Sequence, residues 1–323
     1  MPQTLRRPSA AEIRDAARRI RSFAVPTPLV PIELPDAPCE IWVKLECLQP
    51  IGSFKIRGAA NALAQADPEA LSQGVYTGSA GNMAQGVAWV AREMGLPCRV
   101  VLPDGAPKAK VEAIQRLGAH PVPVPFDEWW RVLMEHGHPD EAGFFVHPVS
   151  DPAVVTGNGT VGLEITNALP DVDAIVVPYG GGGLSCGIGS WVNEAAPNVP
   201  VFAAEVDTAA PLAASLAAGR PTSVTRVPTF VDGIGAGSLL PEMWPLARSV
   251  IEDSIVVSLP EVCDAIRTLA QSTRIIAEGA GGAALAAACS GQAGSGRVVA
   301  VISGGNIDVD ILAAILAGKP PPR

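Results

Sequence analysis

The sequence predicts an α/β protein with mostly parallel sheets flanked by helices. Two patterns carry this prediction: short runs rich in β-branched residues alternate with longer alanine-rich stretches, and three of the short runs end in glycine- and serine-rich turns that open a helical stretch. With 323 residues, of which 48% are hydrophobic and 17% charged, the chain can bury a substantial core.

The elements follow in order along the chain. Nine runs have the composition of strands: EIWVKLE (40–46), GVYTGS (74–79), CRVVLP (98–103), PVPVP (121–125), FFVHP (144–148), AIVVPYG (174–180), VFAAEV (201–206), SIVVSL (254–259) and RVVAVISG (297–304). Six alanine-rich stretches predict helices at residues 58–66, 82–95, 107–117, 184–196, 261–274 and 278–289.

Two turn-rich breaks, near residues 67–74 and 147–153, predict the domain boundaries. They divide the chain into a large domain, residues 1–69 and 152–323, and a small α/β domain inserted into it, residues 70–151. A cleft between two such domains is a common place for a small-molecule site.

Composition and charge exclude several classes of partner. The net charge of −9, without a long basic run, argues against nucleic acid and anionic membranes. No apolar run is long enough to span a bilayer, and the N-terminus lacks the apolar core of a signal peptide. The six cysteines form no CxxC pair, which favours reduced thiols and a cytoplasmic protein.

Three glycine turns predict anion-binding helix starts, in YTGSAGNMAQG (76–86), VVPYGGGGLSCG (176–187) and VAVISGGNIDVD (299–310). The tetraglycine 180–183 is the strongest, because four residues without Cβ let the backbone approach a phosphate closely. A tight turn without a ligand is the alternative interpretation. The GxGxxG match at Gly157, Gly159 and Gly162 follows a poor strand, so we interpret it as a chance match or as a helix start that needs small residues for packing.

Lys55 begins a helical stretch between Phe54 and Ile56. The helix dipole and an apolar setting both lower the pKa of a lysine, and a deprotonated amine is what a Schiff-base lysine needs. On this segment alone, a surface lysine is an equally good interpretation. A lysine and a phosphate cradle in one chain together suggest a phosphorylated aldehyde cofactor.

Five segments carry a resemblance to a known family: KLECLQPIGSFKIRGAANAL, GSAGNMAQGVAWVAREMG, VPYGGGGLSCGI, AEGAGGAALAA and VISGGNID. In this order, over roughly residues 14–316, they resemble the fold-type II pyridoxal-phosphate enzymes, specifically the threonine/serine dehydratase and serine racemase group. The resemblance implies a two-domain, tryptophan synthase β-like fold, pyridoxal 5'-phosphate as cofactor, an amino acid as substrate and a homodimer.

The resemblance also implies roles for single residues. Lys55 would bind the cofactor aldehyde with Phe54 packed beside the ring, and Asn82 would hydrogen-bond the ring hydroxyl. Ser303 would face the pyridine nitrogen. The phosphate would be held by Gly180, Gly181, Gly182, Gly183 and Leu184, and the substrate would be bound by Ser79, Ala80, Gly81, Asn82 and Met83.

A serine partner does not force protonation of the ring nitrogen, which favours rapid loss of a β-leaving group over reprotonation. The sequence is therefore expected to encode a dehydratase that converts a β-hydroxy-α-amino acid, such as threonine, serine or a 3-substituted serine, to a 2-oxo acid and ammonia. Lys55 would take the Cα proton. The alternatives are a racemase or β-replacement enzyme on the same scaffold, or a silent phosphate- or nucleotide-binding α/β protein.

The sequence departs from the family pattern at three places. Racemising relatives carry a second serine where this chain has Ala80, which has no proton to give. Met83 replaces a histidine, which indicates either a different substrate or a harmless exchange pointing into the small domain. Glu205 matches one ligand of a divalent cation in some relatives, but Pro211 occupies the second position, so no metal is expected, although Asp207 could compensate.

Two clusters are interpreted as structural. His136 and His138 are expected in an exposed loop rather than at a metal. Trp129 and Trp130 are expected to pack in the protein rather than to form a cofactor platform.

Overall fold

The computed structural model describes residues 5–34 and 36–322 and contains two sheets. The large sheet has the strand order β1 (Leu29–Ile32), β2 (Glu40–Leu45), β10 (Arg297–Ile302), β7 (Ala174–Pro178), β8 (Val201–Val206) and β9 (Asp253–Val257). Only β1 pairs antiparallel with its neighbour. The small sheet is parallel throughout, with the order β5 (His120–Val124), β4 (Cys98–Pro103), β3 (Val75–Gly78) and β6 (Phe144–Val146).

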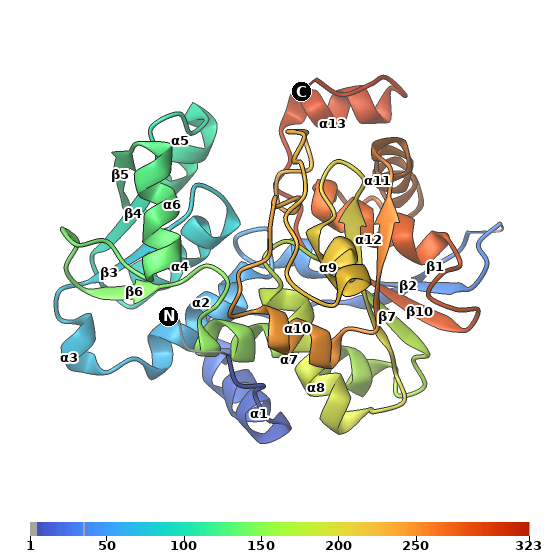
Figure 1. Ribbon diagram of the computed structural model, residues 1–323, viewed down its shortest axis with the longest axis horizontal. Helices are drawn as coiled ribbons and strands as arrows, with labels where there is room; N and C mark the ends of the chain where they lie inside the picture. The colour runs from blue at the N-terminus through green and yellow to red at the C-terminus, as the bar shows by residue number, and fades with distance from the viewer. Residues whose placement is uncertain (1–4, 35, 323) are drawn as a thin grey trace.

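Helices cover both sheets (Figure 1). Those before and around the small sheet are α1 (Ala10–Arg19), α2 (Lys55–Gln65), α3 (Pro68–Leu71), α4 (Asn82–Glu93), α5 (Lys108–Arg116) and α6 (Phe126–Glu135). Those that follow are α7 (Pro152–Ala168), α8 (Gly183–Ala195), α9 (Pro211–Ala218), α10 (Trp244–Val250), α11 (Leu259–Thr273), α12 (Gly279–Cys289) and α13 (Val309–Leu316). Short 3₁₀ turns span Ile20–Ser22 and Glu46–Leu48.

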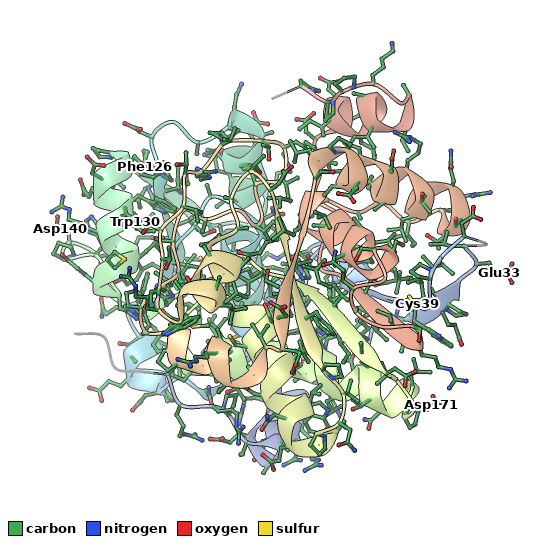
Figure 2. The ribbon with its side chains drawn as sticks, turned by 45° about the vertical axis from the view of Figure 1, so that its right-hand side comes forward. Glu33, Cys39, Phe126, Trp130, Asp140 and Asp171 are labelled. Carbon is green, nitrogen blue, oxygen red and sulfur yellow. The ribbon has the colours of Figure 1, made fainter. Side chains whose placement is uncertain are left out.

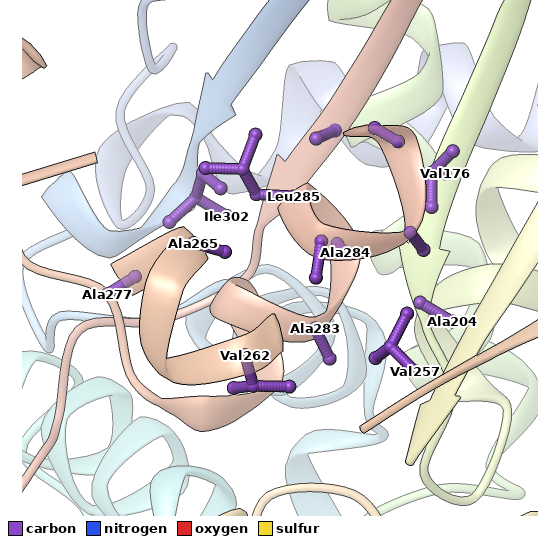
Figure 3. Packing of buried hydrophobic residues seen from close by; sticks show 14 of the residues in the cluster. Val176, Ala204, Val257, Val262, Ala265, Ala277, Ala283, Ala284, Leu285 and Ile302 are labelled. Carbon is purple, nitrogen blue, oxygen red and sulfur yellow. The ribbon is translucent and has the colours of Figure 1, made fainter. Parts of the chain in front are cut away.

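The large sheet is buried on both faces. On one face, α12 lies against the strands and packs with α11, and Ala283 and Ala284 of α12 belong to the same buried cluster as Val176 and Val257 (Figure 3). On the other face, residues of α1, α7 and α8 form a second core with β7 and β10. Burial on both faces explains why these strands read as nearly continuous apolar runs.

Successive residues of the small sheet alternate between its two faces, as the pleat of a strand requires. Val75 and Val100 face a core shared with α2, α4 and α5, whereas Tyr76 and Val101 face α6. Helix α2 lies within the predicted large domain but shares the first of these cores with the small sheet. The domain boundaries at 69/70 and 151/152 therefore stay a prediction. The α/β class and the mostly parallel sheets are confirmed.

The glycines of the GxGxxG match lie inside α7, where they pack against neighbouring helices. A Cβ on Gly157 would lie 2.5 Å from the carbonyl oxygen of Arg57 on α2, and one on Gly159 would lie 2.9 Å from the carbonyl oxygen of Gly187 on α8. These small residues therefore serve helix packing, but they do not mark a helix start, because α7 begins at Pro152.

Candidate active site

Lys55 is the first residue of α2 and has no side-chain cap before it. Its Nζ donates a hydrogen bond to the carbonyl oxygen of Pro148 at 2.8 Å and lies 5.3 Å from the centre of the Phe54 ring. Burial lowers the pKa of Lys55 to about 8, and the carboxylate of Glu278 opposes this shift. A fraction of this amine is thus deprotonated near neutral pH, as the sequence predicts for a reactive lysine.

The tetraglycine forms the turn between β7 and α8. Gly182 has a φ of 94°, in the left-handed region that favours glycine, and precedes the first residue of α8. Close contacts surround the turn: a Cβ on Gly181 would lie 2.6 Å from the Val149 methyl carbons, and one on Gly183 would lie 3.1 Å from the Val149 carbonyl oxygen. The turn has no room for side chains.

The surroundings of this turn fit a phosphate group. Within the described ranges, the buried hydroxyl groups of Tyr179 and Ser185 and the buried amide of Asn158 have no hydrogen-bond partner in the protein. A Cβ on Gly182 would lie 2.9 Å from the Tyr179 hydroxyl. The first amides of α8 also lack intrahelical acceptors. Buried unpaired donors beside a helix N-terminus are what a bound anion satisfies.

The carboxyl end of β10 meets the segment that carries Lys55. The Phe54 amide donates to the carbonyl oxygen of Ser303 at 3.0 Å, and Ser53 forms an isolated bridge with Gly304. Ser303 is 1% exposed. This backbone contact places Ser303 beside the lysine segment, although the two are far apart in the sequence.

Asn82, the first residue of α4, is held by two polar side chains. Its Nδ2 donates to both carboxylate oxygens of Glu278 at 3.0 Å, and its Oδ1 accepts from Nδ2 of Asn306 at 2.9 Å. Glu278 precedes α12, and a Cβ on Gly304 would lie only 2.6 Å from its Oε1. Burial raises the pKa of Glu278 to about 7 and the nearby Asp232 adds to the shift, whereas the Asn82 hydrogen bond and Lys55 oppose it.

Of the remaining predicted substrate residues, Ser79, Ala80 and Gly81 occupy the turn between β3 and α4, and Met83 follows Asn82 on α4. The Ser79 hydroxyl accepts the Gly81 amide at 3.2 Å, and Ala80 is partly buried against the small-sheet core. Met83 is 1% exposed and belongs to that core. This burial supports the interpretation of Met83 as an exchange pointing into the small domain.

Glu205, at the end of β8, is buried and fully engaged by protein donors. Its Oε1 accepts the Leu212 amide at 2.9 Å, and its Oε2 accepts the Ala213 amide at 2.8 Å and the Ser254 hydroxyl at 2.7 Å. Glu205 therefore anchors the N-terminus of α9, which begins at Pro211. Burial raises the pKa of Glu205, and these hydrogen bonds oppose that shift.

Two structural expectations need correction. His136 and His138 lie in the loop after α6 as predicted, but their rings are not fully exposed: the His138 side chain is 7% exposed and bonded to Glu128, and the His136 ring stacks on the buried ring of His147. Trp129 does pack under α6, but Trp130 is 40% exposed on its outer face together with Phe126 (Figure 2). Consecutive residues of a helix point in different directions, so Trp129 can face the apolar side of α6 while Trp130 faces solvent.

Three groups of the site escaped the sequence analysis. Glu278 lies in the quoted segment AEGAGG, which was the one available signal, but nothing in its spacing links it to Asn82. His147 and the Pro148 carbonyl lie in a segment that sequence reasoning treats as a strand end and a boundary. A backbone carbonyl has no sequence pattern of its own.

The fold and site together define a class of protein. Two mostly parallel sheets bring a partly buried amine with a lowered pKa and a glycine cradle for phosphate to either side of the turn at Pro148 and Val149. This arrangement is that of an enzyme that holds a phosphorylated aldehyde cofactor through a lysine.

Comparisons with known proteins agree. The family model described as "Pyridoxal-phosphate dependent enzyme" matches residues 20–304. An L-threonine ammonia-lyase of Thermotoga maritima is 40% identical over 280 residues, covering 86% of this chain and 70% of the relative. A serine racemase of Oryza sativa subsp. indica is 34% identical over 318 residues, covering 93% and 91%. The structure of maize serine racemase superposes with a TM-score of 0.87 at 32% identity, covering 97% of this chain and 98% of that one.

The chain belongs to the pyridoxal-phosphate dependent enzymes, and its fold is that of fold type II. The predicted family, fold class and cofactor are thereby confirmed. In the described part of the chain, no helix is long and apolar enough to cross a membrane.

Proposed function

We propose that this enzyme is a dehydratase, or ammonia-lyase, that converts a β-hydroxy-α-amino acid to a 2-oxo acid and ammonia. Threonine, serine and 3-substituted serines are the candidate substrates. The observation that carries the proposal is the pairing of Lys55, whose pKa is about 8, with Ala80 in the turn where racemising relatives carry a second proton donor. The similarity to an L-threonine ammonia-lyase supports it.

Each part of the site has a task in this reaction. Pyridoxal phosphate, when bound, acidifies the α-hydrogen of an amino acid. The glycine turn would hold its phosphate, Ser303 its ring nitrogen and Asn82 its ring hydroxyl. The free amides in the first turn of α4 would bind the substrate carboxylate. Lys55 would take the α-proton, and its ammonium form would donate a hydrogen bond to the Pro148 carbonyl oxygen.

The net reaction balances without another reactant. Loss of the α-proton and the β-hydroxyl as water leaves an enamine, with a double bond between the α- and β-carbons. The enamine becomes an imine when a proton moves from its nitrogen to its β-carbon through water. Water then adds to the carbon–nitrogen double bond of the imine, and ammonia is released, so the water lost in the first step is regained. No proton donor is needed on the face opposite Lys55, which is consistent with alanine at position 80.

Racemisation is the second candidate, because serine racemases are among the similar proteins. The test is to incubate the enzyme with L-threonine, L-serine and 3-substituted serines, and to follow ammonia, oxo acid and amino-acid chirality. We expect oxo acid and ammonia in equal amounts and little D-amino acid. D-serine formed faster than oxo acid would overturn the proposal, and a product with a new β-substituent would indicate β-replacement.

The lysine assignment has its own control. Lys55→Ala should lose both turnover and the absorbance band that the cofactor shows when joined to a lysine. A band that survives in this variant would place the cofactor on another amine.

We further propose a cytoplasmic homodimer. The support is the family resemblance and six cysteines that are all free thiols in the structure. Light scattering during size-exclusion chromatography should give twice the chain mass of 33.2 kDa.

A further inference from the structure

The turn from His147 to Ser150 connects the small sheet to the helices of the large sheet. It follows β6 and ends at Asp151, which caps α7 by accepting the amide of Ala153. On one side the Pro148 carbonyl oxygen receives Nζ of Lys55, and on the other the Val149 side chain packs on Gly181. This turn therefore contacts both the lysine and the phosphate cradle.

One buried ring holds the turn in place. Nδ1 of His147 accepts the amides of Val149 at 3.1 Å and Ser150 at 2.8 Å, and Nε2 faces the carbonyl oxygen of Leu133 at 3.1 Å. A nitrogen that receives two amide donors must carry a lone pair, and a nitrogen that faces a carbonyl must carry the proton. The imidazole is therefore neutral, with the proton on Nε2.

The surroundings of His147 keep it neutral. The ring is 2% exposed and stacks on the His136 ring with centroids 4.4 Å apart. Burial lowers the pKa of His147 to about 3, and nearby His136 and Lys55 act in the same direction. The ring thus keeps its acceptor throughout the physiological pH range.

We propose that His147 is a positioning residue for Lys55. Its Nδ1 fixes the amides of Val149 and Ser150, and the Val149 amide belongs to the same peptide group as the Pro148 carbonyl. His147 thereby directs the Pro148 carbonyl oxygen toward Nζ and stabilises the ammonium form of the lysine. His147 does not touch the reacting atoms. The inference rests on the proposed function only for its effect on turnover, because the lysine and the carbonyl meet without substrate.

Two substitutions separate the contacts of the two ring nitrogens of His147. His147→Asn places an amide oxygen near the position that Nδ1 occupies in the parent, where an asparagine commonly accepts backbone amides from the residues that follow it. This variant loses the bond to Leu133. His147→Gln reaches the Leu133 carbonyl with an amide and leaves the Val149 and Ser150 amides unpaired. Each variant keeps the contacts of one ring nitrogen, two amide bonds in His147→Asn and one carbonyl bond in His147→Gln, so both are expected to fold, which thermal unfolding would check.

The readout is the pKa of Lys55 in the full-length chain freed of cofactor, measured by competitive acetylation across pH with peptide mass spectrometry. Glu278 and the neutral His147 are the titratable groups that face this amine. Because a carbonyl acceptor favours the charged amine, His147→Gln should lower the pKa of Lys55 by about 1. His147→Asn should leave it within about 0.3 of the parent value. His120→Asn, at an exposed histidine of β5, is the control and should change nothing.

The activity of the loaded enzyme should follow the same order, with kcat kept in His147→Asn and reduced in His147→Gln. Equal pKa values of Lys55 in the two variants would overturn the inference and leave His147 a structural residue. If the pKa pattern holds but no β-hydroxy amino acid releases ammonia, the positioning role stands and the proposed function fails.

Discussion

At the scale of single residues, the site holds two titratable groups whose pKa values move toward each other. Burial lowers the pKa of Lys55 to about 8 and raises that of Glu278 to about 7. In both cases burial outweighs the attraction between the opposite charges. The result is a base and an acid that both change protonation state near neutral pH, which is how active sites are commonly tuned.

The Glu278→Gln variant should reveal the cost of ionising this carboxyl group. The native pKa of about 7 exceeds the usual 4.5, so the folded chain binds a proton that the unfolded chain has lost between these pH values. Stability from this group is therefore fully present below pH 4.5 and is lost as pH rises through 7. Relative to the parent, Glu278→Gln should be equally stable at pH 4.5 and more stable at pH 8 by about 3 kcal/mol at most.

The measurement is denaturant unfolding of parent and variant from pH 4.5 to 8, both freed of cofactor. Only the difference between the two chains is informative, because His147, with its lowered pKa, makes stability rise between pH 3 and 6.5. Lys55 acts at higher pH, between about 8 and 10.5. A stability difference that does not change with pH would contradict the assignment of Glu278 as the titrating group.

At the scale of elements, the decisive feature is the close packing of the glycine turn before α8 against Val149. Val149 limits the shape of this turn, because a Cβ on Gly181 would lie only 2.6 Å from the Val149 methyl carbons. A helix start can bind a phosphate only while its amides stay free and accessible.

Gly181→Ala should weaken binding of pyridoxal phosphate. Its Cβ would lie 2.6 Å from both methyl carbons of Val149, so the turn must shift. Overpacking typically costs about 1–3 kcal/mol, which corresponds to a loss of affinity of about tenfold or more.

The double variant Val149→Ala/Gly181→Ala is the matched test, because it removes the obstructing methyl groups. We expect fluorescence titration with pyridoxal phosphate to show a large part of the affinity restored, with Val149→Ala alone as the control. If the double variant binds as weakly as Gly181→Ala, the contact with Val149 is not what shapes the cradle.

Most strands and the helices that follow glycine turns are predicted closely by the sequence, whereas β1, α1, α6, α9 and α10 are not among the predicted elements. The contacts between elements do not follow from the sequence either. Strand runs and the helix starts after glycine turns are local patterns, so their positions could be predicted, and Lys55 could be placed at a helix start. The link between Asn82 and Glu278 joins residues 196 positions apart. The Lys55 acceptor is a backbone carbonyl. Such contacts depend on how the two sheets are placed, which periodicity does not encode.

At the scale of the whole molecule, α2 joins the two sheets, and a buried charge cluster holds it. Two residues after Lys55, Arg57 bonds to Glu46 after β2 at 2.7 and 2.8 Å and to Glu164 on α7 at 2.6 and 2.8 Å. Lys44 also contacts Glu164, at 2.5 Å. Arg57, Lys44 and Glu46 are each at most 1% exposed. Lys55 is therefore carried by a helix whose first turn is fixed to the segment after β2 and to α7.

Arg57→Met should destabilise the whole fold and not the site alone. Removing one partner of a buried ion pair leaves an uncompensated charge, which typically costs about 3–5 kcal/mol. Thermal unfolding should show this loss, while Arg116→Met, at an exposed position of α5, should stay close to the parent. A loss confined to activity, with stability unchanged, would mean that the cluster does not hold α2 in place.

The anchoring of Glu205 bears on how such an enzyme is controlled. Both oxygens of this buried carboxylate are occupied by two amides of α9 and one hydroxyl of β9. A carboxylate satisfied in this way keeps β8, α9 and β9 together in every ionic environment. At this position we expect the chain to be insensitive to the concentrations of magnesium and calcium around it, so that adding either cation should leave turnover unchanged.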